Sequence, residues 1–356
     1  MTRSKTLRTV LISLLALALA LILSVGGYVL YVLLDYERIP DNQALTPVGG
    51  SGGVERGVIY TALSYNIGFA AYTPDFTFFM DGGTKSRAAS RESVLSVMDG
   101  IGKLARGLSA DFYLFQEVDI DADRSHHVDE ADILIATFPT YGSVFAYNYH
   151  SSYLFWPLTE PHGASDAGLL SLSRFSASAA VRRSLPIADT LSKFLDLDRA
   201  YTVTRYPVEG GRELIVYNVH TSAYGGSDEI RTAQMSMLLS DMQAEYEKGN
   251  YCLAGGDFNH DLSGTSVTHF NGESADYGWA QPFPAELLPE GIRRVLDDGS
   301  VPSCRNCDIP YSPDSFVLTV DGFLVSENIT ARTEVVDTGF TYSDHNPVKI
   351  EFMLMP

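Results

Sequence analysis

An uncharged run near the N-terminus limits the fold more than any other feature of this chain. It extends over 25 residues, from Val10 to Leu34 (VLISLLALALALILSVGGYVLYVLL). A helix of about 20 apolar residues is long enough to cross the hydrocarbon core of a bilayer. The run therefore predicts one transmembrane helix at residues 10–34, ahead of any globular core.

The charges that flank this run predict its orientation. Arg3, Lys5 and Arg8 precede it, whereas Asp35 and Glu37 follow it. Positive residues tend to stay in the cytoplasm, so we expect the remaining chain to lie outside. A cleaved signal peptide is the alternative, although its apolar region usually has about 7–15 residues. The interpretation is a single-pass protein of the cell membrane with an extracellular domain.

The chain then divides into a tether and one domain. Residues 1–9 form the cytoplasmic N-terminus, and residues 35–56 predict a flexible linker because the GGSGG stretch at 49–53 is glycine-rich. Neither a repeat nor a second linker follows, so residues 57–356 are expected to form one domain of about 300 residues. A hydrophobic content of 45% is sufficient for a packed core.

The charge of the domain argues against nonspecific nucleic-acid binding. The whole chain has 25 basic and 44 acidic residues, and removing the four basic and two acidic residues before position 39 leaves 21 and 42. Such an acidic surface repels polyanions and lacks the basic patch that nucleic-acid binders carry. A local cleft can still accept a single phosphate group.

Strand and helix patterns alternate through the domain. Apolar residues recur at helical spacing over 91–108, and a second helix is predicted over 228–248, with Ser227 as its cap and Gly249 as its stop. Strands are predicted at 58–66, 112–117, 168–173, 201–206, 213–219, 251–254, 317–325 and 347–354. Two of them flank Gly210 and Gly211, which indicates a hairpin. This order is typical of an α/β sandwich.

Polar side chains recur at the ends of these apolar strands. They are carboxylates, amides and imidazoles, without any thiolate: Asn66, Glu117, Asn218, His220, Asp257, Asn259, Asp321, Asp344 and His345. Hard oxygen ligands of this kind are those of Mg²⁺ or Mn²⁺. Carboxylates and imidazoles also serve phosphoryl chemistry, in which water must be oriented and protons moved. We expect the set to converge on one edge of a sheet.

Taken in order, the motifs LSYNIGF, LFQEVD, VYNVHTSA, GGDFN, TVDGFLVS and YSDHNPV resemble the endonuclease/exonuclease/phosphatase (DNase I-like) superfamily. The resemblance covers roughly residues 58–353, and GDxN and SDHxP are its most specific parts. It implies a four-layered α/β/β/α sandwich, in which two mixed sheets pack together beneath outer helices.

The resemblance also implies individual roles for the metal and water-orienting residues. Glu117 would be the principal Mg²⁺ ligand, with Asn66 beside it and Asp344 close to the metal. Asp257 would orient the attacking water, and Asn259 would hold a phosphate oxygen.

Two histidines would complete the catalytic set. His345, positioned by Asp321, would transfer a proton and contact the phosphate. His220 would contact the phosphate or assist the leaving group. The resemblance does not decide which histidine is the general base.

Three further residues are candidates for phosphate contacts: Arg124, Arg174 and Asn218. The guanidinium group matches phosphate geometry, but a surface ion pair is an equally good interpretation of each arginine. For Asn218 the alternative is that its amide satisfies backbone groups at a strand end.

Other motifs carry less weight. His260 and Asp261 match no position that the family requires, so we expect turn or rim residues. The segment 119–130 has carboxylates at EF-hand spacing, but Arg124 stands where the loop needs glycine, and a Ca²⁺ site is not predicted. Cys252 is expected in the core. Cys304 and Cys307 can form a short disulfide in an exported domain.

The expected function is that of an Mg²⁺-dependent (or Mn²⁺-dependent) phosphoesterase, monomeric and tethered to the membrane by its N-terminal helix. The acidic surface favours a small or lipid-linked phosphate ester over the alternative substrate, extracellular nucleic acid. A non-catalytic surface binding module is the remaining alternative, and the presence of every required group disfavours it. The segments 70–90, 145–165 and 265–315 are expected to form the pocket, and their aromatic residues can stack on bases, line a lipid groove or only close the core.

Overall fold

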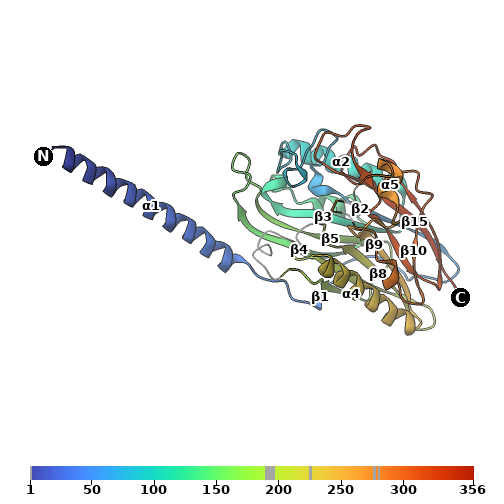
Figure 1. Ribbon diagram of the computed structural model, residues 1–356. Helices are drawn as coiled ribbons and strands as arrows, with labels where there is room; N and C mark the ends of the chain where they lie inside the picture. The colour runs from blue at the N-terminus through green and yellow to red at the C-terminus, as the bar shows by residue number, and fades with distance from the viewer. Residues whose placement is uncertain (1, 189–196, 224–226, 276–277, 280) are drawn as a thin grey trace.

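Two β-sheets packed face to face form the centre of the computed structural model, with helices on both outer faces (Figure 1). The six-stranded sheet has the order β14-β15-β2-β3-β5-β4, and the seven-stranded sheet has the order β1-β6-β7-β8-β9-β13-β10. The structure describes residues 2–188, 197–223, 227–275, 278–279 and 281–356. The predicted four-layered sandwich and its preceding apolar helix are confirmed.

The six-stranded sheet consists of β14 (Ile329–Val335), β15 (Val348–Leu354), β2 (Ile59–Asn66), β3 (Phe112–Ala122), β5 (Gly163–Ser173) and β4 (Gly142–Leu154). The seven-stranded sheet consists of β1 (Gln43–Leu45), β6 (Ala179–Ser184), β7 (Ala200–Val208), β8 (Arg212–His220), β9 (Tyr251–Asp257), β13 (Asp321–Ser326) and β10 (Ile292–Val295). A small sheet pairs β11 (Cys304–Arg305) with β12 (Val317–Leu318).

The α-helices are α1 (Thr2–Asp35), α2 (Arg91–Leu108), α3 (Glu130–Thr137), α4 (Asp228–Glu247) and α5 (Ser266–Asn271). Short 3₁₀ helices are η1 (Gly68–Ala70), η2 (Phe79–Asp81), η3 (Asp123–Ser125) and η5 (Ala285–Leu287).

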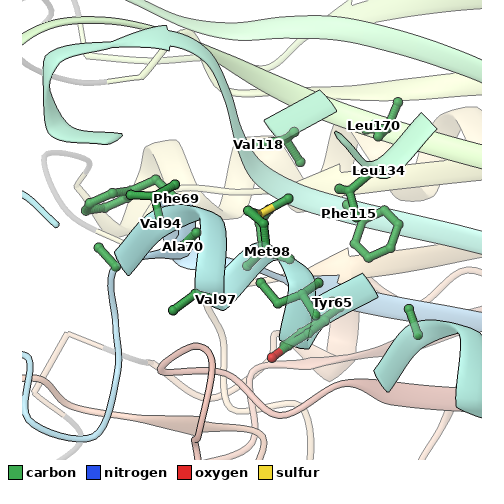
Figure 2. Packing of buried hydrophobic residues seen from close by; sticks show 14 of the residues in the cluster. Tyr65, Phe69, Ala70, Val94, Val97, Met98, Phe115, Val118, Leu134 and Leu170 are labelled. Atoms are coloured by element: carbon green, nitrogen blue, oxygen red, sulfur yellow. The ribbon is translucent and has the colours of Figure 1, made fainter. Parts of the chain in front are cut away.

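Helix α2 covers the six-stranded sheet and begins and ends where the sequence predicts. Its N-cap is Ser90, whose hydroxyl accepts from the Ser93 backbone N–H while Ser93 bonds back to the Ser90 N–H. Its buried face, including Val94 and Met98, packs with Phe115 of β3 in one apolar cluster (Figure 2). This packing aligns β2 and β3 in parallel, so that both strands end on the same side of the molecule.

The seven-stranded sheet is covered by α4. The predicted hairpin forms between β7 and β8, with Ala200 opposite His220, and its two glycines adopt positive φ angles of 87° and 78°. Gly249 ends α4 as predicted, at φ 85°. Ser227 occupies the N-cap position, but its side chain makes no capping hydrogen bond.

The segment 35–56 differs from the flexible linker that its composition suggests. Gln43–Leu45 pairs with β6, and Val54 is buried. Gly50 has φ 75°, and a Cβ atom there would lie 2.3 Å from the carbonyl oxygen of Phe175. Glycine at this position therefore permits close packing against the domain.

Two strand predictions also needed correction. The expected strand at 317–325 is interrupted, because Val317–Leu318 and Asp321–Ser326 belong to different sheets. Strand β3 continues to Ala122, past the predicted end at residue 117, through a bulge that the apolar pattern does not reveal.

Helix α1 extends away from the sandwich (Figure 1). Lys5–Asp35 is long and apolar enough to cross a membrane, and its most apolar stretch is not buried against the domain.

Candidate active site

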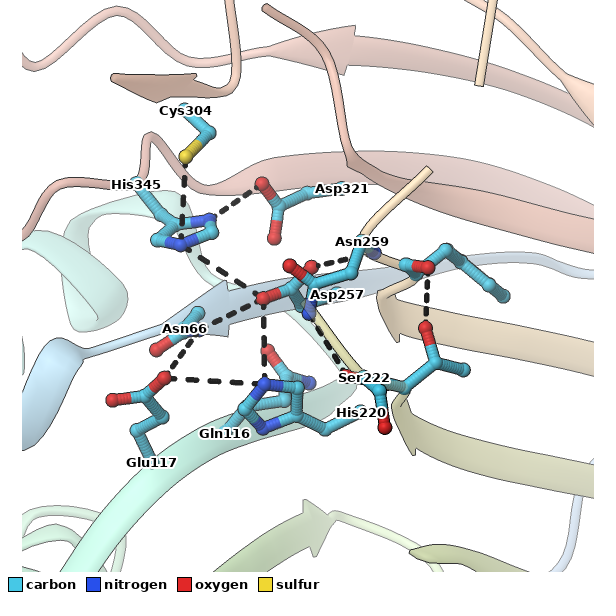
Figure 3. Close-up of polar contacts among 12 residues, drawn as sticks. Asn66, Gln116, Glu117, His220, Ser222, Asp257, Asn259, Cys304, Asp321 and His345 are labelled. Atoms are coloured by element: carbon cyan, nitrogen blue, oxygen red, sulfur yellow. Dashed lines mark hydrogen bonds and ion pairs between the residues drawn. The ribbon is translucent and has the colours of Figure 1, made fainter. Parts of the chain in front are cut away.

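Apart from Asn218, the polar residues predicted at strand ends meet at one edge of the two sheets, and Figure 3 shows most of them. Strands β2, β8 and β9 deliver residues at their C-terminal ends, and β8–β9 is a parallel pair. Strand β3 delivers Glu117 from its middle, because the last residue of the parallel β2, Asn66, lies opposite Gln116. Strand β13 runs antiparallel to β9 and begins with Asp321 opposite Asp257. Strand β15 runs antiparallel to β2, which places Asp344 and His345, just before it, at the same edge.

The predicted metal ligands surround one acidic spot. The Asn66 amide Nδ2 lies 3.0 Å from Asp257 Oδ2 and 3.4 Å from Glu117 Oε1. Glu117 lies in the bulge of β3 with a φ of 53°, and this conformation turns its side chain out of the strand alternation. A cavity lies at this edge of the sheets, and Glu117 and Asp344 both line it.

This carboxylate group has the donor chemistry of a divalent cation site. Burial raises the pKa of Glu117, and the negative charge of Asp344 adds to the rise. A divalent cation would relieve that repulsion. The side chain of Glu117 is 23% exposed, so it can reach both cavity and solvent. The residues present therefore fit a hard metal ion.

A second group of donors lies beside the first. Asp257, Asp321 and His345 each offer a ligand atom within 4.8 Å of the others. However, Asp321 Oδ2 already accepts from His345 Nδ1 at 2.7 Å and from the Ser303 hydroxyl at 2.7 Å. A cation at this position would have to break these bonds, so the Glu117 side of the cavity is the better metal site.

The surroundings of Asp257 allow its carboxylate to exchange a proton near neutral pH. Burial raises its pKa to about 7, with Asp321 adding to the rise and His345 opposing it. Its Oδ1 accepts from the backbone N–H of Asn259 at 2.9 Å. Asn259 has a φ of 47°, and its Nδ2 donates to the Thr221 carbonyl at 2.9 Å, which fixes the turn after β9.

The two histidines have opposite environments. Burial disfavours the charged form of His345, but its bond to Asp321 outweighs burial and raises the pKa well above the usual value. Burial and the neighbouring Arg199 lower the pKa of His220 well below the usual value. Arg199 Nη1 lies 2.8 Å from His220 Nε2. His345 is thus held as a cation and His220 as a neutral imidazole.

The histidines also approach the Asp257 carboxylate from two sides (Figure 3). His220 Nε2 lies 3.6 Å and His345 Nε2 lies 3.8 Å from Asp257 Oδ2. The cavity therefore brings together a carboxylate of pKa about 7, an imidazolium and a neutral imidazole.

Two of the three candidate phosphate contacts lie outside the cavity. Asn218 is buried between the sheets, donating to the Phe115 carbonyl and accepting from Gln116 Nε2 at 2.7 Å. Arg174 has a side chain 51% exposed and lies 3.4 Å from Asp111. Both positions match the structural alternatives, an amide serving other protein groups and a surface ion pair.

Arg124 is the candidate that does line the cavity. Its guanidinium binds both oxygens of Asp119 and lies 4.1 Å from the centre of the Phe69 ring. Because Asp119 is engaged in this way, the segment 119–130 does not form an EF-hand loop.

The remaining motif residues have local roles. His260 and Asp261 are buried and absent from the cavity lining; His260 Nδ1 lies 2.7 Å from the Phe258 carbonyl, and Asp261 accepts from the N–H groups of the following turn. Cys304 and Cys307 are free thiols, with Cys304 Sγ 3.7 Å from His345 Nε2.

Other cavity residues were not predicted from the sequence, among them Arg199, whereas Tyr149, His162 and Trp279 belong to the segments expected at the pocket. Arg199 was within reach of sequence reasoning. A hairpin turning at Gly210 and Gly211 places residue 200 opposite His220, so the preceding arginine must lie near that histidine.

The profile of the Endonuclease/Exonuclease/phosphatase family matches residues 63–345, which is most of the chain and contains every residue of this cluster. The chain belongs to that family. Its members are phosphoesterases and nucleases that hydrolyse phosphate esters, and they generally use divalent metals.

Solved structures share the fold at low sequence identity. An endonuclease/exonuclease/phosphatase from Beutenbergia cavernae is 18% identical with a TM-score of 0.56, covering 83% of this chain and 72% of its own. ANGEL2, described as a 2′,3′-cyclic phosphatase, is 16% identical with a TM-score of 0.53, covering 86% and 100%. TDP2 from C. elegans is 13% identical with a TM-score of 0.51, covering 84% and 76%. Among curated proteins, no sequence match was found.

Proposed function

We propose that this chain is a divalent-metal-dependent phosphoesterase, with Mg²⁺ or Mn²⁺ as its ion, that acts as a monomer outside the cell membrane. Residues 10–34 would anchor it, and the domain 57–356 would hydrolyse a phosphodiester or phosphomonoester. The observation that carries this proposal is the meeting of Glu117, Asp257 and His345 in one cavity, with Asp321 bonded to His345.

Each residue of the site would have a separate role in the reaction. Glu117, with Asn66 and Asp344 beside it, would hold the cation, which when bound neutralises phosphate charge. Asp257 would orient the attacking water and accept its proton, since its pKa of about 7 suits a general base at neutral pH.

The phosphate oxygens would meet positive and neutral donors. The Asn259 amide and the His345 imidazolium would contact them from one side, and Arg199, whose Nη1 donates to Nε2 of the neutral His220, from the other. Because Asp321 keeps His345 protonated, His345 can supply a proton to the leaving oxygen.

Small or lipid-linked phosphate esters are the favoured substrates, because the formal net charge of −19 opposes a long polyanion. An extracellular nuclease is the second candidate function. It is favoured by Tyr72, Tyr149 and Trp279 in the cavity lining, because aromatic rings can stack on bases.

The test is an activity screen of the full chain in detergent with Mg²⁺, Mn²⁺ or EDTA. Substrates would be bis-p-nitrophenyl phosphate, DNA, RNA, sphingomyelin and inositol phosphates. We expect metal-dependent turnover that Glu117→Gln reduces roughly 100-fold or more, while Asp121→Asn, at an exposed carboxylate, leaves it unchanged. Absence of turnover on every substrate, with ligand binding intact in Glu117→Gln, would favour the non-catalytic binding module.

The anchor has its own test. The protein in the membrane fraction should have an N-terminus that lies ahead of the apolar run at residues 10–34. A start after the apolar run would instead show a cleaved signal peptide.

A further inference from the structure

The loop between β4 and β5 carries an apolar surface that the core does not use. Residues 154–158 read LFWPL, and the side chains of Phe155, Trp156 and Leu158 are 52%, 65% and 76% exposed. Glu160 is the one charged residue in the loop 155–162, and its carboxylate accepts from the Ser86 backbone N–H at 3.0 Å. The loop thus directs its charge inward and its aromatic rings outward.

Helix α1 contacts the end of β4, at Ser152 and Tyr153, and the start of the loop, at Phe155, in a defined order. At the end of the helix, Asp35 accepts from the Ser152 hydroxyl at 2.6 Å. One turn earlier, the Tyr31 hydroxyl accepts from the Tyr153 N–H at 3.3 Å. One turn earlier still, Tyr28 donates to the Tyr153 carbonyl at 3.0 Å, and its ring lies 5.1 Å from that of Phe155.

The order of these contacts indicates how deep the loop would lie in a bilayer that α1 crosses. Asp35 is the first charged residue after the apolar run, so it belongs at the headgroup level if α1 crosses a bilayer. At a helical rise of 1.5 Å per residue, Tyr28 lies about 10 Å further toward the membrane centre. Phe155 packs on Tyr28, and therefore it reaches the interfacial region, where tyrosine and tryptophan are enriched. In Figure 1 the end of β4 lies on the side of the domain from which α1 leaves.

We propose that Phe155, Trp156 and Leu158 insert into the outer leaflet beside α1 and hold the active-site cavity at the membrane surface. This inference rests on the membrane anchoring in the proposed function and names a lipid-linked phosphate as the substrate class. The occupant of this surface is lipid, because the loop continues the apolar surface of α1 where the two elements touch.

The loop also connects the proposed membrane contact to the active-site cavity. Tyr149 of β4 and His162, at the end of the loop, both line the cavity. Both flank the inserted residues in sequence, so the position of the loop in the bilayer sets the position of the cavity mouth. A phosphate in a lipid headgroup would then enter without leaving the surface.

Insertion would be driven by apolar burial and not by charge. From Ser125 to Ser173 the chain contains neither lysine nor arginine. A zwitterionic surface is therefore sufficient, and salt should have little influence on docking.

The direct test uses the full chain in phosphatidylcholine vesicles whose acyl chains carry bromine at a shallow position. The chain has two tryptophans, so the contribution of Trp156 is the difference between wild type and Trp156→Phe. We expect this difference to be strongly quenched, and equally so at low and high salt. Equal quenching of Trp156→Phe and wild type, or none in either, would overturn the proposal. This readout does not depend on turnover, so it stands even if the proposed activity fails.

A second experiment asks whether the loop serves catalysis or only folding. The triple variant Phe155→Ser/Trp156→Ser/Leu158→Ser should hydrolyse a vesicle-borne phosphate ester about tenfold more slowly, while soluble bis-p-nitrophenyl phosphate changes less than about twofold. Leu296→Ser, at another exposed apolar residue, should change neither rate. Equal losses on both substrates would show a structural role, and unchanged rates on both would likewise contradict membrane docking.

Discussion

Burial lowers the pKa of both His345 and His220, and their charged neighbours then act in opposite directions. Asp321 stabilises the imidazolium of His345, whereas Arg199 opposes a positive charge on His220. Two histidines in one buried cavity can thus have distinct roles, a proton donor and a neutral contact, without any difference in residue type.

Replacing Asp321 should therefore change the pH dependence. In Asp321→Asn the effect of burial on His345 is opposed less strongly, so its pKa falls and the imidazolium is lost at lower pH. We expect the alkaline limb of the kcat/KM profile to move to lower pH, and the rate at neutral pH to fall roughly 100-fold. An unchanged alkaline limb, measured over the same pH range as wild type, would exclude a protonated His345 from the reaction.

Arg199 should affect phosphate binding, whereas Arg174 should not. Arg199→Gln removes a buried cation next to His220, so KM should rise and kcat/KM should fall roughly 10- to 100-fold. Arg174→Gln is the matched control, because this arginine faces Asp111 and solvent. Steady-state kinetics on the same substrate compares them. Equal effects of the two substitutions would contradict this assignment.

The fate of individual residues shows what the sequence can predict. Asp257 and Asn259 follow an apolar strand directly, so their place at the sheet edge was predictable. Arg199 was predictable from hairpin register. The place of Asn218 was not predictable, because its partners Phe115 and Gln116 come from the other sheet. The sequence of a single strand does not show how two sheets pack.

At the scale of elements, the bulge in β3 matters most for the site. Without it Glu117 would continue the strand alternation, and the extended pairing with β5 would place it differently. The strand periodicity predicted β3 but not the bulge, since a bulge is fixed by how two strands and their helices pack. The long β4 was missed for a similar reason: its pairing with β5 is irregular in two places.

The Glu245 carboxylate connects the C-terminal end of α4 to Arg205 of the seven-stranded sheet. Burial alone would raise the pKa of Glu245, but hydrogen bonds from Arg205, Lys248 and Asn250 lower it to about 2. Arg205 Nη2 lies 2.5 Å from Glu245 Oε1, and the Glu245 side chain is 9% exposed.

This arrangement predicts a pH-dependent loss of stability in Glu245→Gln. A folded pKa below the usual value means that the carboxylate stabilises the fold above about pH 4.5 and loses this effect as pH falls toward 2. The variant should lose about 1–2 kcal/mol of unfolding free energy at pH 7, and the difference should shrink by pH 3. Denaturant unfolding at both pH values measures this.

An exposed ion pair provides the control for this prediction. Glu351→Gln breaks a pair whose Arg332 side chain is 81% exposed, so we expect a loss of less than about 0.5 kcal/mol at either pH. A loss for Glu245→Gln that is the same at pH 7 and pH 3 would show that packing, and not charge, fastens α4.

At the scale of the whole molecule, the two sheets meet at a cavity whose lining includes four carboxylates and three arginines. Each sheet supplies part of the cluster: Asn66 and Glu117 come from one, and His220 and Asp257 from the other. The site therefore exists only when the two sheets are packed together. A cation bound in the cavity should stabilise the entire sandwich, because the unfolded chain has no such site.

Mg²⁺ should accordingly raise the melting temperature of the full chain in detergent. At a concentration 100 times the dissociation constant the gain is about 2.7 kcal/mol, or roughly 5 °C for a domain of this size. Because the pKa of Glu117 is raised, protons compete with the metal, and the shift should shrink as pH falls. Glu117→Gln should abolish most of the shift, whereas Asp121→Asn should retain it. An equal shift in Glu117→Gln and wild type would place the metal elsewhere, and calorimetric titration of the two proteins with Mg²⁺ would decide the point without reference to any substrate.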